Sequence, residues 1–170
     1  LMDIWMLKKA VAMIALLVAG CGPSPSYVAK MEYNLEAQKA GLPIIIDNIS
    51  VSSPNSAGGI DFDVDVTNTS SKTIKYLSIT AQAYNAVGDA VRGDISRSSF
   101  FKGLDTGPYA PNETTASGTW SNAWYGYSIR CARVTRIKIT YMDNSIRSFP
   151  NTSSIAKLLR PGVSNSCSVQ

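Results

Sequence analysis

The feature that most constrains the fold is a strict alternation of apolar and acidic residues in segment 60–66. It reads Ile60-Asp61-Phe62-Asp63-Val64-Asp65-Val66. Successive side chains of a β-strand point to opposite faces of its sheet, so the apolar residues share one face and the aspartates share the other. The segment therefore predicts a strand with one face in a core and the other in solvent.

Further segments with strand-like composition are separated by clusters of Gly, Pro, Asn, Asp and Ser. The expected strands are 44–52, 74–84, 114–120, 127–133, 133–141 and 146–149. Segment 91–101 is ambiguous, and Gly107-Pro108 and Pro111-Asn112 are expected to bracket a loop. Roughly seven short strands joined by turns are typical of an antiparallel sandwich or barrel.

Two segments have helical character instead. Between residues 27 and 40, the apolar residues Val28, Met31 and Leu35 recur at spacings of three and four. This segment is either a spacer helix or a disordered tether, and we favour a partly ordered helix. Segment 153–160 is expected to form one short helix.

The N-terminal region carries the features of a signal peptide. Lys8 and Lys9 precede an uninterrupted apolar run, residues 10–19, which is too short to span a bilayer as a helix of about 20 residues. Asp3 fits this pattern poorly, so we expect the natural start at Met6. The apolar run leads into Leu17-Val18-Ala19-Gly20-Cys21, which resembles the bacterial lipobox.

That resemblance implies that the Cys21 thiol receives a diacylglycerol and that the chain is cleaved just before it. Acylation of the new amino group then makes the anchoring stable. The alternative is an ordinary secretory peptide, or a buried apolar segment with a chance cysteine. Gly22 follows the cysteine. By the sorting rule of enterobacterial lipoproteins, this implies an outer-membrane protein that faces the periplasm.

The central region resembles immunoglobulin-like domains of bacterial envelope proteins. The resemblance rests on residues 68–74, with an Asn-x-Ser turn, on residues 84–89, with Asn-x-x-Gly, and on residues 107–120. It implies an antiparallel immunoglobulin-like β-sandwich and says little about function, because such domains host many activities. The expected organisation is a signal peptide (1–20), a lipidated tether with a short helix (21–43), the sandwich (44–150) and a C-terminal tail (151–170).

Cys131 and Cys167 remain once Cys21 is lipidated. Two spare cysteines in an oxidising compartment usually form a disulfide, which here would join the C-terminal tail to a late strand. Free thiols and a metal pair are the alternatives. The chain has no histidine and no third thiol for a zinc site, so we expect no metal.

The three aspartates of segment 60–66 could be read as a calcium site, since that cation prefers clustered carboxylates. Alternation along a strand spaces them about 7 Å apart on a line rather than around one point. We therefore favour a solvated strand face.

Trp120, Trp124, Tyr125 and Tyr127 are the densest group of aromatic residues in the chain. Exposed rings could stack on a sugar or anchor a protein partner. Core packing of one or both tryptophans is the favoured alternative. If the protein has a binding surface, this segment is the first candidate.

A group of basic residues lies in a region with little acid: Arg130, Arg133, Arg136, Lys138 and Arg147. Arg136 and Lys138 share one face of an expected strand and could contact anionic lipid headgroups or lipopolysaccharide. A solvated outer face is the favoured reading.

The absence of histidine excludes Ser-His-Asp and Cys-His catalysis, and no phosphate-binding or dinucleotide-binding motif is present. A net charge of +4 without a concentrated basic cluster does not favour nucleic acid. We expect a non-enzymatic envelope lipoprotein, without a cofactor, that binds a protein or polymer partner or supports an assembly. The alternative is a glycan-binding module that uses the aromatic group.

Overall fold

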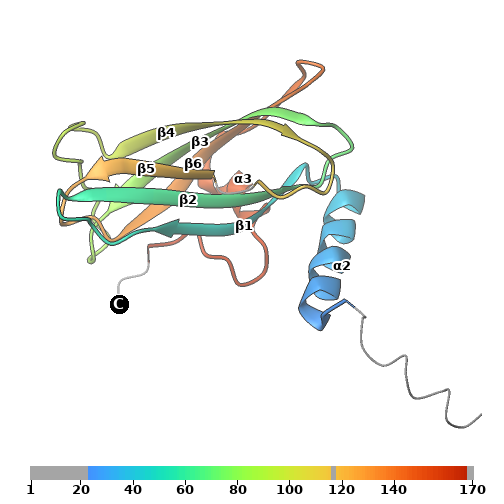
Figure 1. The fold of residues 1–170 in the computed structure, drawn as a ribbon, viewed down its shortest axis with the longest axis horizontal. Coiled ribbons are helices and arrows are strands. Elements are labelled where there is room, and N and C mark those ends of the chain that lie inside the picture. The colour runs from blue at the N-terminus through green and yellow to red at the C-terminus, as the bar shows by residue number, and fades with distance from the viewer. Residues whose placement is uncertain (1–22, 116–117, 168–170) are drawn as a thin grey trace, which may run out of the picture. The chain divides into compact units, whose positions relative to one another are not determined.

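The computed structural model describes residues 23–115 and 118–167 (Figure 1). The chain divides into two compact units, with the boundary between Tyr33 and Asn34. Helix α2 (Pro25–Lys39) begins in the first unit and ends in the second, which confirms a helix in the tether region. The strands and helix α3 (Thr152–Ala156) all belong to the second unit.

The second unit consists of two antiparallel sheets (Figure 1). The first has the order β1-β2-β5, with bounds Ile44–Val51, Gly59–Asn68 and Gly118–Tyr125. The second has the order β4-β3-β6-β7, with bounds Phe100–Tyr109, Ile74–Tyr84, Cys131–Tyr141 and Ile146–Phe149. The predicted fold class, a mainly β antiparallel sandwich, is confirmed.

Except for the place of β4, the strand order is that of an immunoglobulin-like sandwich. Strand β2 pairs with β5 and β3 pairs with β6, so strands that are not consecutive in the chain lie side by side. In the constant-type immunoglobulin domain the fourth strand belongs to the sheet of the first, second and fifth. Here β4 pairs with β3 instead, which widens the second sheet.

The alternation of segment 60–66 places the core as predicted. Ile60, Phe62, Val64 and Val66 are at most 1% exposed, and their aspartate neighbours lie on the outer face of β2. They pack against inward-facing residues of the second sheet: Leu77, Ile79, Ala81, Val134, Ile137 and Ile139.

Four segments differ from expectation. Strand β5 covers Gly118–Tyr125 rather than 114–120, and α3 covers Thr152–Ala156 rather than 153–160. Residues 107–109 are not a loop, because β4 continues to Tyr109 through a cis Gly107–Pro108 bond. Strand β4 is an edge strand, where the missing N–H of proline can be tolerated. The strand expected over 127–133 is also wrong: residues 126–130 connect β5 to β6, and β6 begins at Cys131.

The segment after α3 covers the open edge of β1. The Ile46 amide donates to the Leu158 carbonyl at 2.7 Å, and the Arg160 amide donates to the Ile46 carbonyl at 3.0 Å. The Arg160 guanidinium bonds Asp47 of β1 at 2.5 Å and Asn34 of α2 at 2.7 Å. The start of the C-terminal tail is therefore built into the sandwich.

Candidate functional site

The proposed anchor, Cys21, lies outside the described residues. Within residues 23–115 and 118–167, no helix is both long enough and apolar enough to cross a membrane. Lipidation of Cys21 thus stays a prediction from the lipobox.

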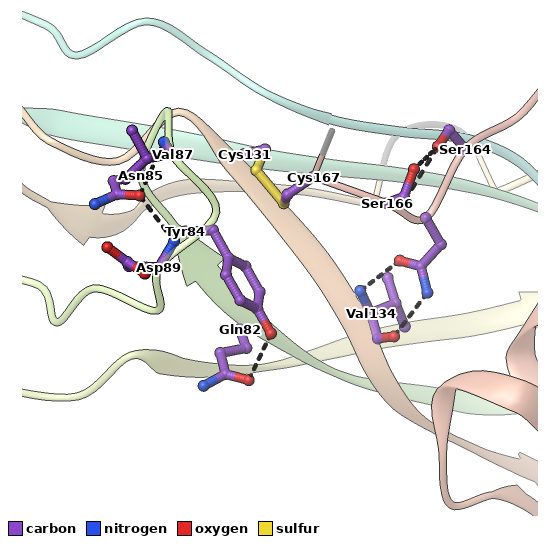
Figure 2. The surroundings of a disulfide bond; sticks show 11 residues. Gln82, Tyr84, Asn85, Val87, Asp89, Cys131, Val134, Ser164, Ser166 and Cys167 are labelled. Atoms are coloured by element: carbon purple, nitrogen blue, oxygen red, sulfur yellow. Dashed lines mark hydrogen bonds between the residues drawn. A yellow bond between two sulfur atoms is a disulfide. The ribbon is translucent and has the colours of Figure 1, made fainter. Parts of the chain in front are cut away.

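Cys131 and Cys167 form a disulfide, as predicted (Figure 2). The S–S distance is 2.06 Å, the Cα atoms are 5.7 Å apart, and the bond joins residues separated by 36 positions. It fastens the C-terminal tail to the first residue of β6.

A second contact fastens the tail next to that bond. The Val134 amide donates to Asn165 Oδ1 at 2.7 Å, and Asn165 Nδ2 donates to the Val134 carbonyl at 2.8 Å (Figure 2). Strand β7 pairs with β6 only over residues 137–140. The Asn165 side chain therefore bonds a part of β6 that β7 does not reach.

The aromatic segment does not form one exposed platform. Trp124 is 1% exposed and belongs to the core, so its assignment to a binding surface is corrected. Its ring meets Phe62 edge-on, with centroids 5.6 Å apart, and Phe101 of the second sheet at 5.5 Å. Core packing, the favoured alternative, holds for this residue.

Trp120 is half-buried and packs against the same aromatic cluster. Its ring stacks on Phe62 at a centroid distance of 5.8 Å and lies 5.9 Å from Phe101. A Cβ on Gly103 would come within 2.3 Å of Trp120 Cε2, so the indole lies directly on the β4 backbone. One face of this ring is therefore occupied by protein.

Tyr125 and Tyr127 lie at the end of β5. Tyr125 is half-buried, whereas Tyr127 is 61% exposed and donates its hydroxyl to the Ser56 carbonyl at 2.9 Å. Of the four aromatic candidates, only Tyr127 is largely exposed.

The outer surface of β1-β2-β5, here called the acidic face, carries Asp61, Asp63 and Asp65. None of its three strands contains Lys or Arg. Asp61 Oδ1 accepts from the Asn122 amide at 2.7 Å, and Asp63 Oδ1 accepts from Thr119 Oγ1 at 2.5 Å. No group of three or more His, Cys, Asp or Glu side chains that could hold a metal ion occurs within the described ranges.

The outer surface of β4-β3-β6-β7, here called the basic face, gathers four cations. Register places Arg133 opposite Gln82, Arg136 opposite Thr80 and Lys138 opposite Ser78, so all three share the outer side of β6. Lys102 of β4 pairs with Thr80 from the opposite edge of β3 and lies on the same outer face. The four positive side chains thus come from β4 and β6, the two strands on either side of β3.

No carboxylate balances these cations among the described outward residues of this sheet. The one acidic residue of its strands is Asp105, which lies opposite Leu77 on the inner side. Four large apolar side chains are exposed on the same face: Tyr76 36%, Phe100 51%, Leu104 59% and Ile146 55%. The basic face is therefore both cationic and partly apolar.

A hollow of about 430 Å³ lies on the basic face. It is lined by Tyr76, Ser78, Lys102, Leu104, Lys138 and Thr140. Ser78 of the central strand lies between Leu104 of β4 and Lys138 of β6. Ammonium groups and hydroxyls in such a hollow are suited to a phosphate or carboxylate.

The other two members of the basic group expected from the sequence, Arg130 and Arg147, lie elsewhere. Arg130 donates to the carbonyls of Tyr127 and Ile129, at 2.9 and 3.0 Å. Arg147 donates to the Gly41 carbonyl at 3.1 Å and lines a separate polar cleft of about 480 Å³. That cleft contains one charged side chain, and its Thr69 hydroxyl is bonded to the Leu42 carbonyl.

Two titratable groups are shifted by their surroundings. Burial and the neighbouring Asp105 raise the pKa of the Tyr109 hydroxyl. Hydrogen bonds from Lys72 and Ser145 lower the pKa of the Asp143 carboxyl, which is exposed at the β6–β7 turn. Neither group belongs to the basic face.

Sequence reasoning found three of the four cations of the basic face and missed Lys102. The pairing of β4 with β3 is what brings Lys102 to this face, and β4 was not expected. Phe100 and Leu104 were missed for the same reason. No family model, curated protein or solved structure matches this chain.

Proposed function

We propose that this chain is a non-enzymatic binding module of the bacterial cell envelope. Lipid on Cys21 anchors it in the outer membrane, facing the periplasm, and the basic face binds an anionic partner. The observation that carries the proposal is the collection of Lys102, Arg133, Arg136 and Lys138 on one sheet face, where no described outward residue is a carboxylate.

A sheet face is a suitable platform for such binding. Its side chains extend from hydrogen-bonded strands over a packed core, so little backbone ordering is needed when the partner arrives. Arg133 is further held by the Tyr84 ring, with its guanidinium carbon 4.9 Å from the ring centroid. Clustered charge of one sign also accelerates the encounter with an oppositely charged partner.

The anchor and its compartment are supported by two separate features. The lipobox supports the anchor itself. The Cys131–Cys167 disulfide supports only an oxidising compartment such as the periplasm, where such bonds persist. The aromatic segment supports the glycan-binding alternative less, since Trp124 is buried and Trp120 is packed on Gly103.

Site-specific photo-crosslinking in living cells tests the binding face. A photoreactive residue at Thr80, in the middle of the basic face, is expected to capture a partner, and Arg136→Gln with Lys138→Gln should abolish the adduct. The matched control is the same probe at Ser50 on the acidic face, opposite Asp63. Equal capture from both positions would contradict the proposed face.

Metabolic labelling with palmitate tests the anchor. Cys21→Ser is expected to remove the label and to release the protein from the membrane fraction. Cys167→Ser, the control, removes one sulfur atom of the disulfide and should keep both the label and the membrane location. Label that persists in Cys21→Ser would rule out lipidation at this residue.

A further inference from the structure

We infer that the partner of the basic face is an anionic phospholipid surface, with a headgroup phosphate seated in the hollow between Lys102 and Lys138. The inference rests on the proposed function and names its partner. Lipid on Cys21 would attach the protein to the bilayer by acyl chains. The basic face would add a second, reversible contact made by the folded unit itself.

The hollow has the chemistry that a phosphate diester requires. Lys102 and Lys138 line it from strands on either side of β3 and supply two ammonium groups. Ser78 and Thr140 add hydroxyl donors. Arg136, opposite Thr80, extends the positive charge along β6 beyond the hollow.

The exposed apolar side chains favour a membrane over a soluble anion as the partner of the basic face. Leu104 and Tyr76 line the hollow, and Phe100 and Ile146 lie on the same sheet face. All four are at least 36% exposed. A free anion leaves these side chains in water, whereas a phospholipid surface offers both phosphate and the upper acyl region, where such residues are stabilised.

A second copy of this chain is the competing occupant, because its acidic face bears three carboxylates along one strand. Two of them, Asp61 and Asp63, are already engaged by Asn122 and Thr119. No large apolar residue of β1, β2 or β5 is exposed in the described chain, so Phe100 and Leu104 would face polar groups. The lipid surface fits the basic face better.

Vesicle co-sedimentation tests the inference with the full chain carrying Cys21→Ser, which has no acyl chain. Vesicles of phosphatidylglycerol mixed with phosphatidylcholine are compared with phosphatidylcholine alone. Residues 1–20 are the same in every variant, so differences between variants report the folded unit. Lys102→Gln with Lys138→Gln should weaken binding to the anionic vesicles about 30-fold, since each charge near such a surface contributes about 1 kcal/mol.

Two further variants sharpen the result. Lys39→Gln with Lys157→Gln removes the same charge from exposed positions in α2 and next to α3, and should bind as the parent does. Phe100→Ser with Leu104→Ser should weaken vesicle binding several-fold while leaving all four cations in place. Both substituted side chains are exposed, so unchanged circular dichroism is expected.

Three outcomes would overturn the inference. One is equal vesicle binding by the parent and Lys102→Gln/Lys138→Gln. Another is displacement from vesicles by inorganic phosphate together with no effect of Phe100→Ser/Leu104→Ser, which would identify a free-anion site. The third is self-association in the absence of vesicles that is abolished by Lys102→Gln with Lys138→Gln. This result would show that the basic face binds a second copy of the chain.

The photo-crosslinking result separates this inference from the proposed function. A protein adduct at Thr80 that depends on Arg136 and Lys138, combined with unchanged vesicle binding, would overturn the lipid surface and keep the binding face. Absence of both the adduct and vesicle binding would overturn the two together.

Discussion

Gly103 has to be a glycine because an aromatic ring occupies the place of its side chain. A Cβ there would lie 2.3 Å from Trp120 Cε2, and the ring is held in turn by Phe62 and Phe101. We predict that Gly103→Ala lowers the free energy of unfolding by about 1–3 kcal/mol, because the indole must shift within a packed cluster. Urea unfolding followed by tryptophan fluorescence measures this.

The neighbouring position provides the control for Gly103. Leu104 is 59% exposed on the other side of β4, so Leu104→Ala should change stability by less than about 0.5 kcal/mol. Equal stability of Gly103→Ala and the parent would show that the Trp120 ring is free to move away.

Because of Tyr109, the free energy of unfolding is expected to change with pH in the alkaline range. Its pKa is raised above the ordinary 10.0 by burial and by Asp105, so the folded chain holds this proton more tightly than the unfolded chain does. The resulting stabilisation is fully present below pH 10.0 and is lost as the pH rises towards the folded-state pKa. Spectroscopic titration of tyrosinate should show one late-ionising tyrosine that is missing from Tyr109→Phe, and Asp105→Asn should bring its ionisation to lower pH.

At the scale of elements, the C-terminal tail holds the part of β6 that has no strand neighbour on the β7 side. It supplies the disulfide and the Asn165 side chain to the part of β6 that β7 does not cover. We predict that Cys131→Ala with Cys167→Ala lowers stability by about 2–4 kcal/mol, and that Asn165→Ala accelerates amide hydrogen exchange at Val134. Ser166→Ala, which leaves both contacts intact, should have neither effect.

The elements differ in how readily the sequence predicts them. Strand β3 begins and ends where expected, and β2 was found because every second residue is apolar and inward-facing. Strand β6 was found because the same alternation holds on either side of a bulge between Val134 and Ile137. Strand β4 was missed since Gly103, Asp105 and Gly107 occupy the inner positions between Phe101 and Tyr109 and interrupt the apolar alternation. A glycine inside a strand commonly marks a close approach by another group, which here is Trp120.

At the scale of the whole molecule, one aromatic cluster joins the two sheets. Phe62 of β2 contacts Trp120 and Trp124 of its own sheet, and lies edge-on to Phe101 of the other at 6.2 Å. We predict that Phe62→Leu lowers stability by about 1–3 kcal/mol. Unfolding midpoints from fluorescence and far-ultraviolet circular dichroism should stay coincident, because the sheets share one core. Separate transitions would show that the sheets unfold independently.

The separation of charge between the two sheets is also a property of the whole molecule. The acidic face has no cation within its strands, and the basic face has no outward carboxylate in the described chain. The net charge of +4 conceals this separation, since the opposite charges nearly cancel in the sum. Only the assignment of strands to two different sheets makes the separation visible.

The sequence by itself determined the β class, the inward and outward sides of β2, the pairing of Cys131 with Cys167 and the expected anchor at Cys21. These depend on local alternation, on cysteine number and on a contiguous motif. The tertiary structure alone decided that Lys102 joins Arg133, Arg136 and Lys138, that Trp124 and not Trp120 is the fully buried tryptophan, and that β4 is a strand. Each of these depends on which distant strand lies alongside, and that is decided by packing between segments that are far apart in the chain, not by the residues of one segment.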